Sequence, residues 1–461
     1  MRSTVASGLT ALLLVAGCGA DPAPAVPRSA TSSAAATAST GASASADVMH
    51  SANVTHVANV PPQAPLDGPQ AWGTDLAFQG DHVFVGNYDG FSVFDVSDPT
   101  RPAAVSRVLC PGEQNDVSVS GNLLFLSVDS PRGGPACGSA EGRRGSDEGW
   151  EGIRIFDITD KAHPAFVSAV RTECGSHTHT LVPGKDGDEV YLYISSPGPE
   201  PESTTCPAPH DNLSVVEVPV KDPAAAKVVS MPKISEEKDE ESLGGCHDIT
   251  AYPEKDLAAA ACFGDGLLLD ISDRPHPRVL QRVHDEENFS IWHSATFDNA
   301  ATKVVFGDEL GGGVSATCDG ATPENHGADA VYDLSKDRKL TLRGYFKIPR
   351  EQQPDENCVA HNGSLLPVPG RDIMVQSWYQ GGVSIWDFTD ASAPREIGFF
   401  ERGPVEGVGG SWSAYYYNGY IYSSDITKGL DVLRIDDPLT DPARKVTLKE
   451  LNAQTQVSYP E

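Results

Sequence analysis

The chain has 461 residues and a formal net charge of −30, with 64 acidic and 34 basic side chains. A surface of that sign repels phosphate backbones and anionic headgroups, so the composition argues against nucleic-acid binding and against direct docking on acidic lipid. The charge is typical of a highly soluble protein, and attraction of cationic ligands or metal ions is the alternative explanation.

The N-terminus has the pattern of an export signal. Residues 1–17 begin with Met-Arg, continue through a short apolar segment and end in Val-Ala-Gly. The segment is too short to span a bilayer and is typical of a secretory signal peptide. Cys18 follows directly, and Val-Ala-Gly-Cys resembles a bacterial lipobox. That resemblance implies a lipid on Cys18 and a protein anchored to a membrane outside the cytoplasm, whereas an ordinary signal peptide with an incidental cysteine is the alternative.

The next segment, residues 18–50, consists mainly of Ala, Ser, Thr, Pro and Gly. Such a composition buries too little apolar surface to offset the entropy lost on ordering the chain. We therefore predict a disordered tether over residues 18–50 and one folded domain over residues 51–461.

A short pattern recurs seven times in that domain. Each copy has an apolar strand, an aspartate or its equivalent, a small or hydroxyl residue and a turn, as in Asp-Val-Ser-Asp-Pro, Asp-Ile-Thr-Asp and Asp-Phe-Thr-Asp. The aspartate column comprises Asp95, Asp157, Glu217, Asp270, Asp333, Asp387 and Arg434. Successive members are 47 to 63 residues apart. A period of that length with several strands in each unit is typical of a β-propeller blade.

The first unit contains four strand-like segments, at residues 72–78, 82–87, 91–96 and 103–109. They are separated by Asp-Gly and Asp-Pro, which favour tight turns. We therefore predict an all-β fold, a seven-bladed β-propeller of four-stranded antiparallel blades. Residues 53–60 match the outer strand of the other blades and are expected to close the ring by joining the last blade.

These copies resemble the LVIVD-repeat β-propeller family, over roughly residues 70–440 if all seven count. The resemblance implies a seven-bladed propeller, often found on exported bacterial proteins. The family has no uniform activity, so the resemblance leaves the function to be argued from individual residues.

Eight cysteines lie in the propeller segment, and an even number in an exported chain is typical of disulfides. Their positions along the blades gather them on one face of the ring. The simplest pairing joins Cys110 to Cys137, Cys174 to Cys206, Cys246 to Cys262 and Cys318 to Cys358. Thiolate ligation of a metal is the alternative, although no Cys-x-x-Cys pair is present.

Histidine recurs at the start of the innermost strand in four consecutive blades. The residues are His177, His247, His293 and His361. Innermost strands line the channel of a propeller, so these imidazoles are expected to converge at its mouth. Neutral imidazole is a common ligand of Zn, Cu and Fe, and a set without thiolate or carboxylate favours such ions over Ca or Mg. A structural histidine ring inherited from one ancestral blade is the alternative.

Several neighbouring residues are candidates to support that site. Asp75, Asp116 and Asp248 occupy the same region of their blades and can orient the rings or complete the ligand set. His179, two residues after His177, is a further ligand or a packing residue. The acidic loop pairs at 240–241, 308–309 and 355–356 are expected to form a solvated rim around the mouth.

Two classes of function fit these features. The first is a cell-surface or periplasmic binding scaffold for an unidentified protein or small molecule, with a histidine-bound metal in its channel. The second is a Cu-, Fe- or Zn-dependent enzyme, an oxidase for example. The selenium-binding proteins, which include methanethiol oxidases, are similar in blade number and channel histidines but share no motif. The sequence names no catalytic residue, nucleophile or dinucleotide motif.

Overall fold

The computed structural model describes residues 48–143, 148–199, 203–235 and 244–460. The expected signal peptide, Cys18 and nearly all of the expected tether lie outside the described residues, as does the acidic pair at 240–241. Among the residues that are described, no helix is long and apolar enough to cross a membrane.

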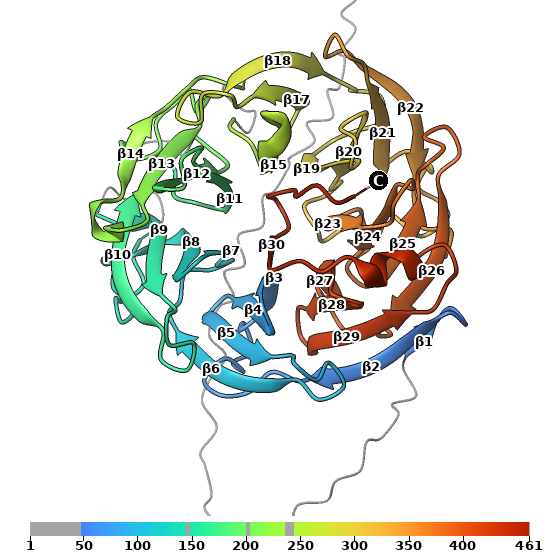
Figure 1. Cartoon of the computed structure of the whole chain (residues 1–461), viewed down its shortest axis with the longest axis horizontal. Helices are drawn as coiled ribbons and strands as arrows, with labels where there is room; N and C mark the ends of the chain where they lie inside the picture. Colours follow the sequence, from blue (N-terminus) through green and yellow to red (C-terminus); the bar gives the residue numbers. More distant parts are fainter. Residues whose placement is uncertain (1–47, 144–147, 200–202, 236–243, 461) are drawn as a thin grey trace, which may run out of the picture. The chain divides into compact units, whose positions relative to one another are not determined.

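The described chain forms seven antiparallel sheets arranged as blades around a central axis (Figure 1). The predicted seven-bladed propeller is therefore confirmed. Blades 1 to 3 contain β3 (Gly73–Gln79), β4 (His82–Asn87), β5 (Gly90–Asp95) and β6 (Ala103–Leu109); β7 (Val117–Ser120), β8 (Leu123–Arg132), β9 (Trp150–Asp157) and β10 (Ala165–Arg171); and β11 (Thr178–Pro183), β12 (Glu189–Ser195), β13 (Ser214–Pro219) and β14 (Lys227–Ser230).

Blades 4 to 7 follow in chain order. They contain β15 (Asp248–Tyr252), β16 (Leu257–Cys262), β17 (Asp265–Asp270) and β18 (Arg278–Val283); β19 (Trp292–Phe297), β20 (Lys303–Asp308), β21 (Asp329–Leu334) and β22 (Leu340–Phe346); β23 (Gly363–Leu366), β24 (Ile373–Ser377), β25 (Val383–Asp387) and β26 (Arg395–Glu401); and β27 (Ser411–Tyr417), β28 (Tyr420–Asp425) and β29 (Gly429–Ile435). Short 3-10 helices lie at Pro223–Ala225, Pro253–Lys255 and Asp441–Lys445.

The repeated aspartate stabilises the turn between the third and fourth strands. Asp95 Oδ1 accepts the backbone N–H of Ser97 at 2.8 Å, and Asp157 Oδ1 accepts that of Thr159 at 2.7 Å. The same bond recurs in blades 4 and 6. The backbone bond from Ser97 holds the pKa of Asp95 below its ordinary value. The sequence period is therefore the signature of a repeated Asx turn.

Buried apolar side chains fill the space between blades. In the interface between blades 4 and 5, Trp292, Phe306 and Leu268 belong to one buried cluster. Gly266 faces this cluster, and a Cβ there would lie 2.6 Å from the Trp292 ring. The close approach of the two blades therefore requires glycine at this position.

The N-terminal end of the domain closes the ring. β2 (Val54–Val60) pairs antiparallel with β29 and supplies the fourth strand of blade 7, which confirms the expected role of residues 53–60. β1 (Met49–His50) adds a short fifth strand to blade 6. The last two residues of the expected tether, 49 and 50, therefore form part of a blade.

The C-terminal segment crosses the channel, which the sequence did not predict. β30 (Glu450–Asn452) joins the inner edge of blade 1, and the chain then runs through the centre of the ring (Figure 1). Asn452 exchanges two hydrogen bonds with the backbone of Val119, and Ala251 exchanges backbone bonds with Gln454 and Gln456. Two bonds join Asn299 to Tyr459. The segment thereby spans the far ends of the inner strands.

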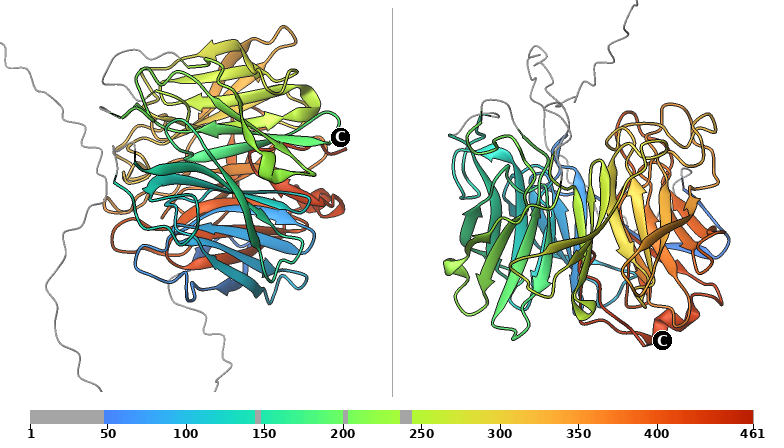
Figure 2. Two further views of the ribbon diagram at one scale, coloured as in Figure 1. Left: turned by 90° about the vertical axis from the view of Figure 1, so that its left-hand side faces the viewer. Right: turned by 90° about the horizontal axis from the view of Figure 1, so that it is seen from above.

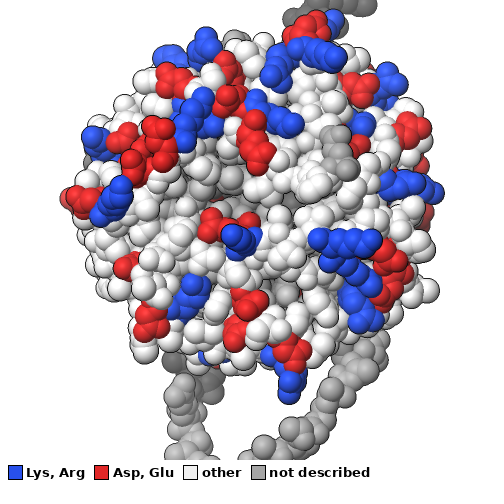
Figure 3. Space-filling view, viewed as in Figure 1, with Lys and Arg blue, Asp and Glu red and all other residues white. Residues whose placement is uncertain are grey.

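The two faces of the ring differ. In Figure 2 the C-terminus lies on one face, and long connections project from the opposite face. On the face that carries the C-terminal segment, acidic and basic side chains are interspersed (Figure 3). The C-terminal segment lies at the far ends of the inner strands, so the opposite end of the channel is the one at which those strands begin.

Candidate metal centre

The fold places the four histidines at the end of the channel where the inner strands begin. His177 and His247 immediately precede β11 and β15, and His293 is the second residue of β19. The backbone N–H groups of His177 and His247 bond Ser195 and Ala261, at the ends of the second strands. These inner hairpins hold the histidine backbone at the channel mouth, as the repeat alignment predicts.

The four imidazoles lie in a row across neighbouring blades. The Nε2 atoms of His177 and His247 are 2.9 Å apart. Ring centroids are 3.9 Å apart for His247 and His293, and 4.5 Å apart for His293 and His361. The side chains of His293 and His361 are 1% and 2% exposed. The structure therefore brings together all four candidate ligands.

A carboxylate joins the row. Glu309 directly follows β20, and its two carboxylate oxygens lie 3.7 Å from His293 Nε2 and 3.7 Å from His361 Nε2. The expectation that the pair 308–309 belongs to a solvated rim is wrong, because Glu309 is 6% exposed and Asp308 is fully buried. Asp308 accepts backbone N–H groups of Ser290, Ile291 and Gly327, which anchors the loop and turns Glu309 into the channel.

Three of these residues could chelate one ion. Ligand atoms of His247, His293 and Glu309 all lie within 4.8 Å of one another. Neither ring nitrogen of His293 has a hydrogen-bond partner among the described residues, and the same holds for His247 Nδ1. A buried unpaired polar group costs about 1–3 kcal/mol. Bare nitrogens beside a carboxylate therefore fit a site for a cation.

Burial sets the protonation of the site. It lowers the pKa of His293 well below its usual value and that of His361 to about 3, so both rings are neutral. His361 Nδ1 donates to the Trp412 carbonyl at 2.5 Å, which leaves Nε2 with its lone pair toward Glu309. Burial raises the pKa of Glu309 to about 8, although a hydrogen bond from the Tyr379 hydroxyl opposes the shift. Without a cation, Glu309 is therefore protonated at neutral pH.

His177 lies at the edge of this group. Its Nδ1 donates to Asp129 Oδ2 at 2.7 Å. Burial opposes its protonation, but the bond to Asp129 and the charge of that carboxylate raise its pKa. The sequence analysis did not identify Asp129, because this residue lies in β8 and not at the repeated position of an inner strand. Asp129 therefore orients His177 with Nε2 toward His247.

The other candidates lie around and below the histidines. Asp248 Oδ1 is 3.4 Å from His247 Nδ1. Asp75 and Asp116 line the same small cavity as His247, His293 and His361, which has space for about one water-sized group. Burial raises the pKa of Asp75 to about 7, with the charge of Asp116 as the next cause. These two aspartates form a second polar layer beneath the imidazoles.

His179 does not join the ligand row. Its Nε2 lies 2.6 Å from Ser118 Oγ and its Nδ1 lies 2.8 Å from Ser127 Oγ. Asp116 Oδ2 accepts its backbone N–H at 2.8 Å. Both ring nitrogens are thus already hydrogen-bonded, and the packing role is the one that the structure supports.

Four disulfides lie near the end of the channel where the inner strands begin, and they join the pairs expected from the blade topology: Cys110–Cys137, Cys174–Cys206, Cys246–Cys262 and Cys318–Cys358. Cys246 is adjacent to His247, and Cys174 and Cys358 lie three residues before His177 and His361. Four disulfides are typical of a protein that folds in an oxidising, extracytoplasmic compartment.

We expect the Cys246–Cys262 disulfide, which adjoins His247, to affect the affinity for metal. We expect the Cys110–Cys137 disulfide to leave that affinity unchanged. Replacing Cys246 and Cys262 by serine should weaken zinc binding about tenfold, because outer groups that fix a ligand typically contribute 10- to 100-fold. The matched control replaces Cys110 and Cys137, whose blade has no channel histidine. Calorimetric titration of both variants checks this, and equal losses of affinity in the two would contradict it.

Comparisons with known proteins agree with the architecture. The LVIVD repeat family model matches residues 73–110, which cover the strands of blade 1. No curated protein matches the chain.

Among solved structures, the periplasmic gluconolactonase PpgL of Pseudomonas aeruginosa is 13% identical, with a TM-score of 0.52 over 83% of this chain and 97% of that chain. The β-propeller domain of Cps50 (Swd1) from Myceliophteria thermophila is 12% identical, with a TM-score of 0.50 over 79% of this chain and 97% of that chain. At these identities the similarity is one of fold. The chain is a seven-bladed β-propeller whose first blade carries an LVIVD repeat.

Proposed function

We propose that this chain is an extracytoplasmic metal-binding propeller that holds one transition-metal ion at the channel mouth. His247, His293 and Glu309 are the principal ligands, and His361 Nε2 is within reach of the same carboxylate. The observation that carries the proposal is the buried His293 ring, whose nitrogens have no hydrogen-bond partner among the described residues and whose Nε2 faces Glu309. A histidine ring held for structural reasons would have its nitrogens bonded, as those of His179 are.

The donor set bears on the choice of ion. The ligand row expected from the sequence held imidazoles, with Asp75, Asp116 and Asp248 as candidates to complete it. The structure adds the carboxylate of Glu309. Imidazole with one carboxylate suits Zn, Cu and Fe, and the site provides no thiolate. A bound ion of this kind would supply a Lewis-acid or redox centre.

An enzyme is the second candidate, and the number of ligands favours it over a purely structural metal site. Structural zinc sites are closed by four protein ligands, whereas catalytic sites keep three and leave a position for water or substrate. His247, His293 and Glu309 make such a set of three, and His247 and His293 line a small cavity that could hold a fourth, exogenous ligand. The proposed exogenous ligand is therefore water or a group of similar size, because the adjoining cavity has space for about one water-sized group. A protein-binding scaffold is the remaining reading of the propeller.

We also infer that Cys18 carries a lipid and anchors the propeller to a membrane surface. The lipobox-like run at residues 15–18 and the four disulfides support export, and Cys18 itself lies outside the described residues. Fractionation of a Cys18→Ala variant tests the anchor, and a variant that stays in the membrane fraction like the parent would refute it.

Metal analysis of the purified protein tests the centre itself. After incubation with Zn, Cu and Fe salts and desalting, we expect about one ion per chain in the parent and near-complete loss in His293→Ala, because one ligand of a chelate is missing. The metal-free melting temperatures should agree closely, because His293 has no hydrogen bond to lose.

His163→Ala is the matched control, since that histidine is 84% exposed on an outer turn. It should retain the ion. A parent protein that binds none of the three metals would remove the proposal.

A further inference from the structure

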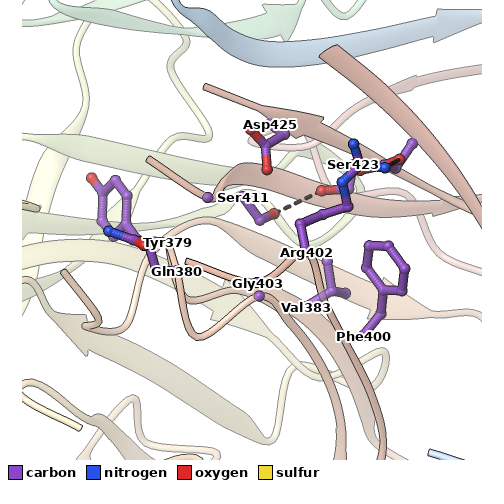
Figure 4. Close-up of a pocket in the computed structure, with 12 residues that line it drawn as sticks. Tyr379, Gln380, Val383, Phe400, Arg402, Gly403, Ser411, Ser423 and Asp425 are labelled. Carbon is purple, nitrogen blue, oxygen red and sulfur yellow. Dashed lines mark hydrogen bonds and ion pairs between the residues drawn. The ribbon is translucent and has the colours of Figure 1, made fainter. Parts of the chain in front are cut away.

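A second polar cavity lies between blades 6 and 7, on different residues from the histidine row. Blade 7 contributes Ser411, Ser423, Asp425 and Asp431 to it, and Arg402 and Tyr379 of blade 6 are among its other lining residues. Figure 4 shows the Asp425 carboxylate directed into the space between Tyr379 and the Arg402 side, beside the linked hydroxyls of Ser411 and Ser423.

The four blade 7 residues share one face of the sheet. Ser411 pairs with Asp425 across β27 and β28, and Ser423 pairs with Asp431 across β28 and β29. Directly paired residues of antiparallel strands have Cβ atoms about 4.5–5.5 Å apart. Farther along, the same interface is apolar, with Ile421 of blade 7 and Ile385 of blade 6 in one cluster. The two carboxylates and two hydroxyls are therefore a local polar cluster in an otherwise hydrophobic interface.

One oxygen of each carboxylate is already satisfied. Asp425 Oδ1 accepts the backbone N–H groups of Thr427 and Lys428 at 3.0 and 2.8 Å. Asp431 Oδ1 lies 2.8 Å from His56 Nε2 and accepts Arg402 at 3.2 Å. These bonds fix both carboxylates, so their second oxygens are held rather than free to rotate to other partners.

The second oxygens have no protein partner among the described residues. Asp425 Oδ2 and Asp431 Oδ2 are both buried and unbonded there, in side chains of residues only 2% and 1% exposed. Burying a carboxylate oxygen without a partner is costly unless a proton or a cation compensates. The two orphaned oxygens therefore point to a missing positive charge.

The neighbouring charges and the size of the cavity restrict the kind of group that can compensate the two aspartates. Arg402 contacts Asp431, but Lys428 Nζ donates to the carbonyls of Arg402 and Gly403 at 2.8 and 2.9 Å. Neither of these basic side chains bonds the second oxygen of Asp425 or Asp431, so among the described residues both oxygens remain without a positive partner. The cavity has space for about one water-sized group, so it fits an ion and excludes an organic ligand.

We propose that this cavity is a second cation site, for a hard divalent ion such as Ca²⁺, ligated by Asp425 Oδ2, Asp431 Oδ2 and the hydroxyls of Ser411 and Ser423, with water completing the shell. Oxygen donors without nitrogen or sulfur select such ions, and Ca²⁺ accepts flexible sets of six to eight oxygens. With Arg402 close by, affinity should lie in the range of about 0.1–1 mM found for extracellular calcium modules.

Luminescence of Tb³⁺, a probe for Ca²⁺ sites, tests the proposal on the full chain. Tyr379 lines the cavity and can sensitise the ion. We expect saturable emission that Ca²⁺ displaces, and at least about tenfold weaker binding in Asp425→Asn, because one of two carboxylate ligands is lost. Asp425→Asn keeps the Oδ1 acceptor, and circular dichroism in EDTA checks that it folds.

Two controls separate this site from surface charge and from the histidine row. Asp273→Asn removes an aspartate that is 64% exposed and should bind Tb³⁺ like the parent. His293→Ala should also keep the response, so failure of the transition-metal proposal leaves this result unaffected. Tb³⁺ binding that is equal in Asp425→Asn and the parent would overturn the proposal. So would a parent without a saturable site, which would mean that a proton compensates the aspartates.

Discussion

Glu309→Gln is expected to weaken zinc binding about 100-fold at pH 8, since a chelating residue contributes about 3 kcal/mol of the 10–16 kcal/mol of a four-ligand zinc site. Glutamine is nearly isosteric and can still accept the Tyr379 hydroxyl, which lies 2.5 Å from Glu309 Oε1. The variant should therefore fold like the parent. Competition titration against a chromophoric chelator measures the affinity.

The pH dependence of binding gives a second readout of the same residue. In the metal-free protein burial raises the pKa of Glu309 to about 8, so below that pH an incoming ion must displace its proton. Apparent affinity should rise about tenfold per pH unit up to pH 8 and then level off. His361, whose pKa is lowered to about 3, stays neutral throughout. Glutamine carries no such proton, so Glu309→Gln should remove the slope.

The exposed Glu351 supplies the matched control. Glu351→Gln makes the same chemical change on a neighbouring loop and should alter neither the affinity nor the slope. A parent protein that binds zinc with the same affinity and pH profile as Glu309→Gln would show that this carboxylate is no ligand.

Removal of residues 450–461 should lower the melting temperature by at least about 10 °C. The segment bonds Val119, Leu181, Ala251 and Asn299 on four different inner strands or their ends. Each bond contributes about 1 kcal/mol net, and 1 kcal/mol corresponds to about 2 °C in a large domain. Differential scanning calorimetry gives the shift.

Two further variants keep that test interpretable. A chain that ends at Tyr459 retains the crossing segment and should melt like the parent. If the larger truncation does not fold, Gln454→Ala still removes the bond from its amide to Asp75 Oδ2, which is 2.8 Å long. A truncated protein as stable as the parent would mean that the seven blades alone determine stability.

Sequence reasoning could predict the blades and the histidine row because both follow the repeat. Asp95 and Asp157 each accept the backbone N–H of the second residue after them, so the same Asx turn marks the same point of their blades. Once the turns are aligned, the start of each inner strand is fixed, and with it the channel positions of His247 and His293. The outer strand at 54–60 and the disulfide pairing follow from the same alignment.

The features that the sequence analysis did not predict depend on contacts that do not follow the repeat. Glu309 enters the channel because Asp308 binds N–H groups from two other loops, at 290–291 and at Gly327. A short acidic pair in a loop is usually solvated, and nothing local distinguishes this one. Beyond its pairing with β3, the crossing of residues 450–459 is held by one or two hydrogen bonds to each of several blades in turn. No hydrophobic or turn pattern marks such a segment, so the sequence offers no signal for it.

Both ends of the chain help to close the ring, and this determines the stage of folding at which the histidine site is complete. β2 joins blade 7, and Gln454 bonds Asp75 across 379 positions of sequence. Contacts of such separation form late, because the loops that they close are long. A chain still emerging during synthesis or export lacks the residues that cover the far end of the channel. The metal centre proposed above would thus be completed only in the finished protein, and its ion would come from the metals present where the chain finishes folding rather than from those where it is made.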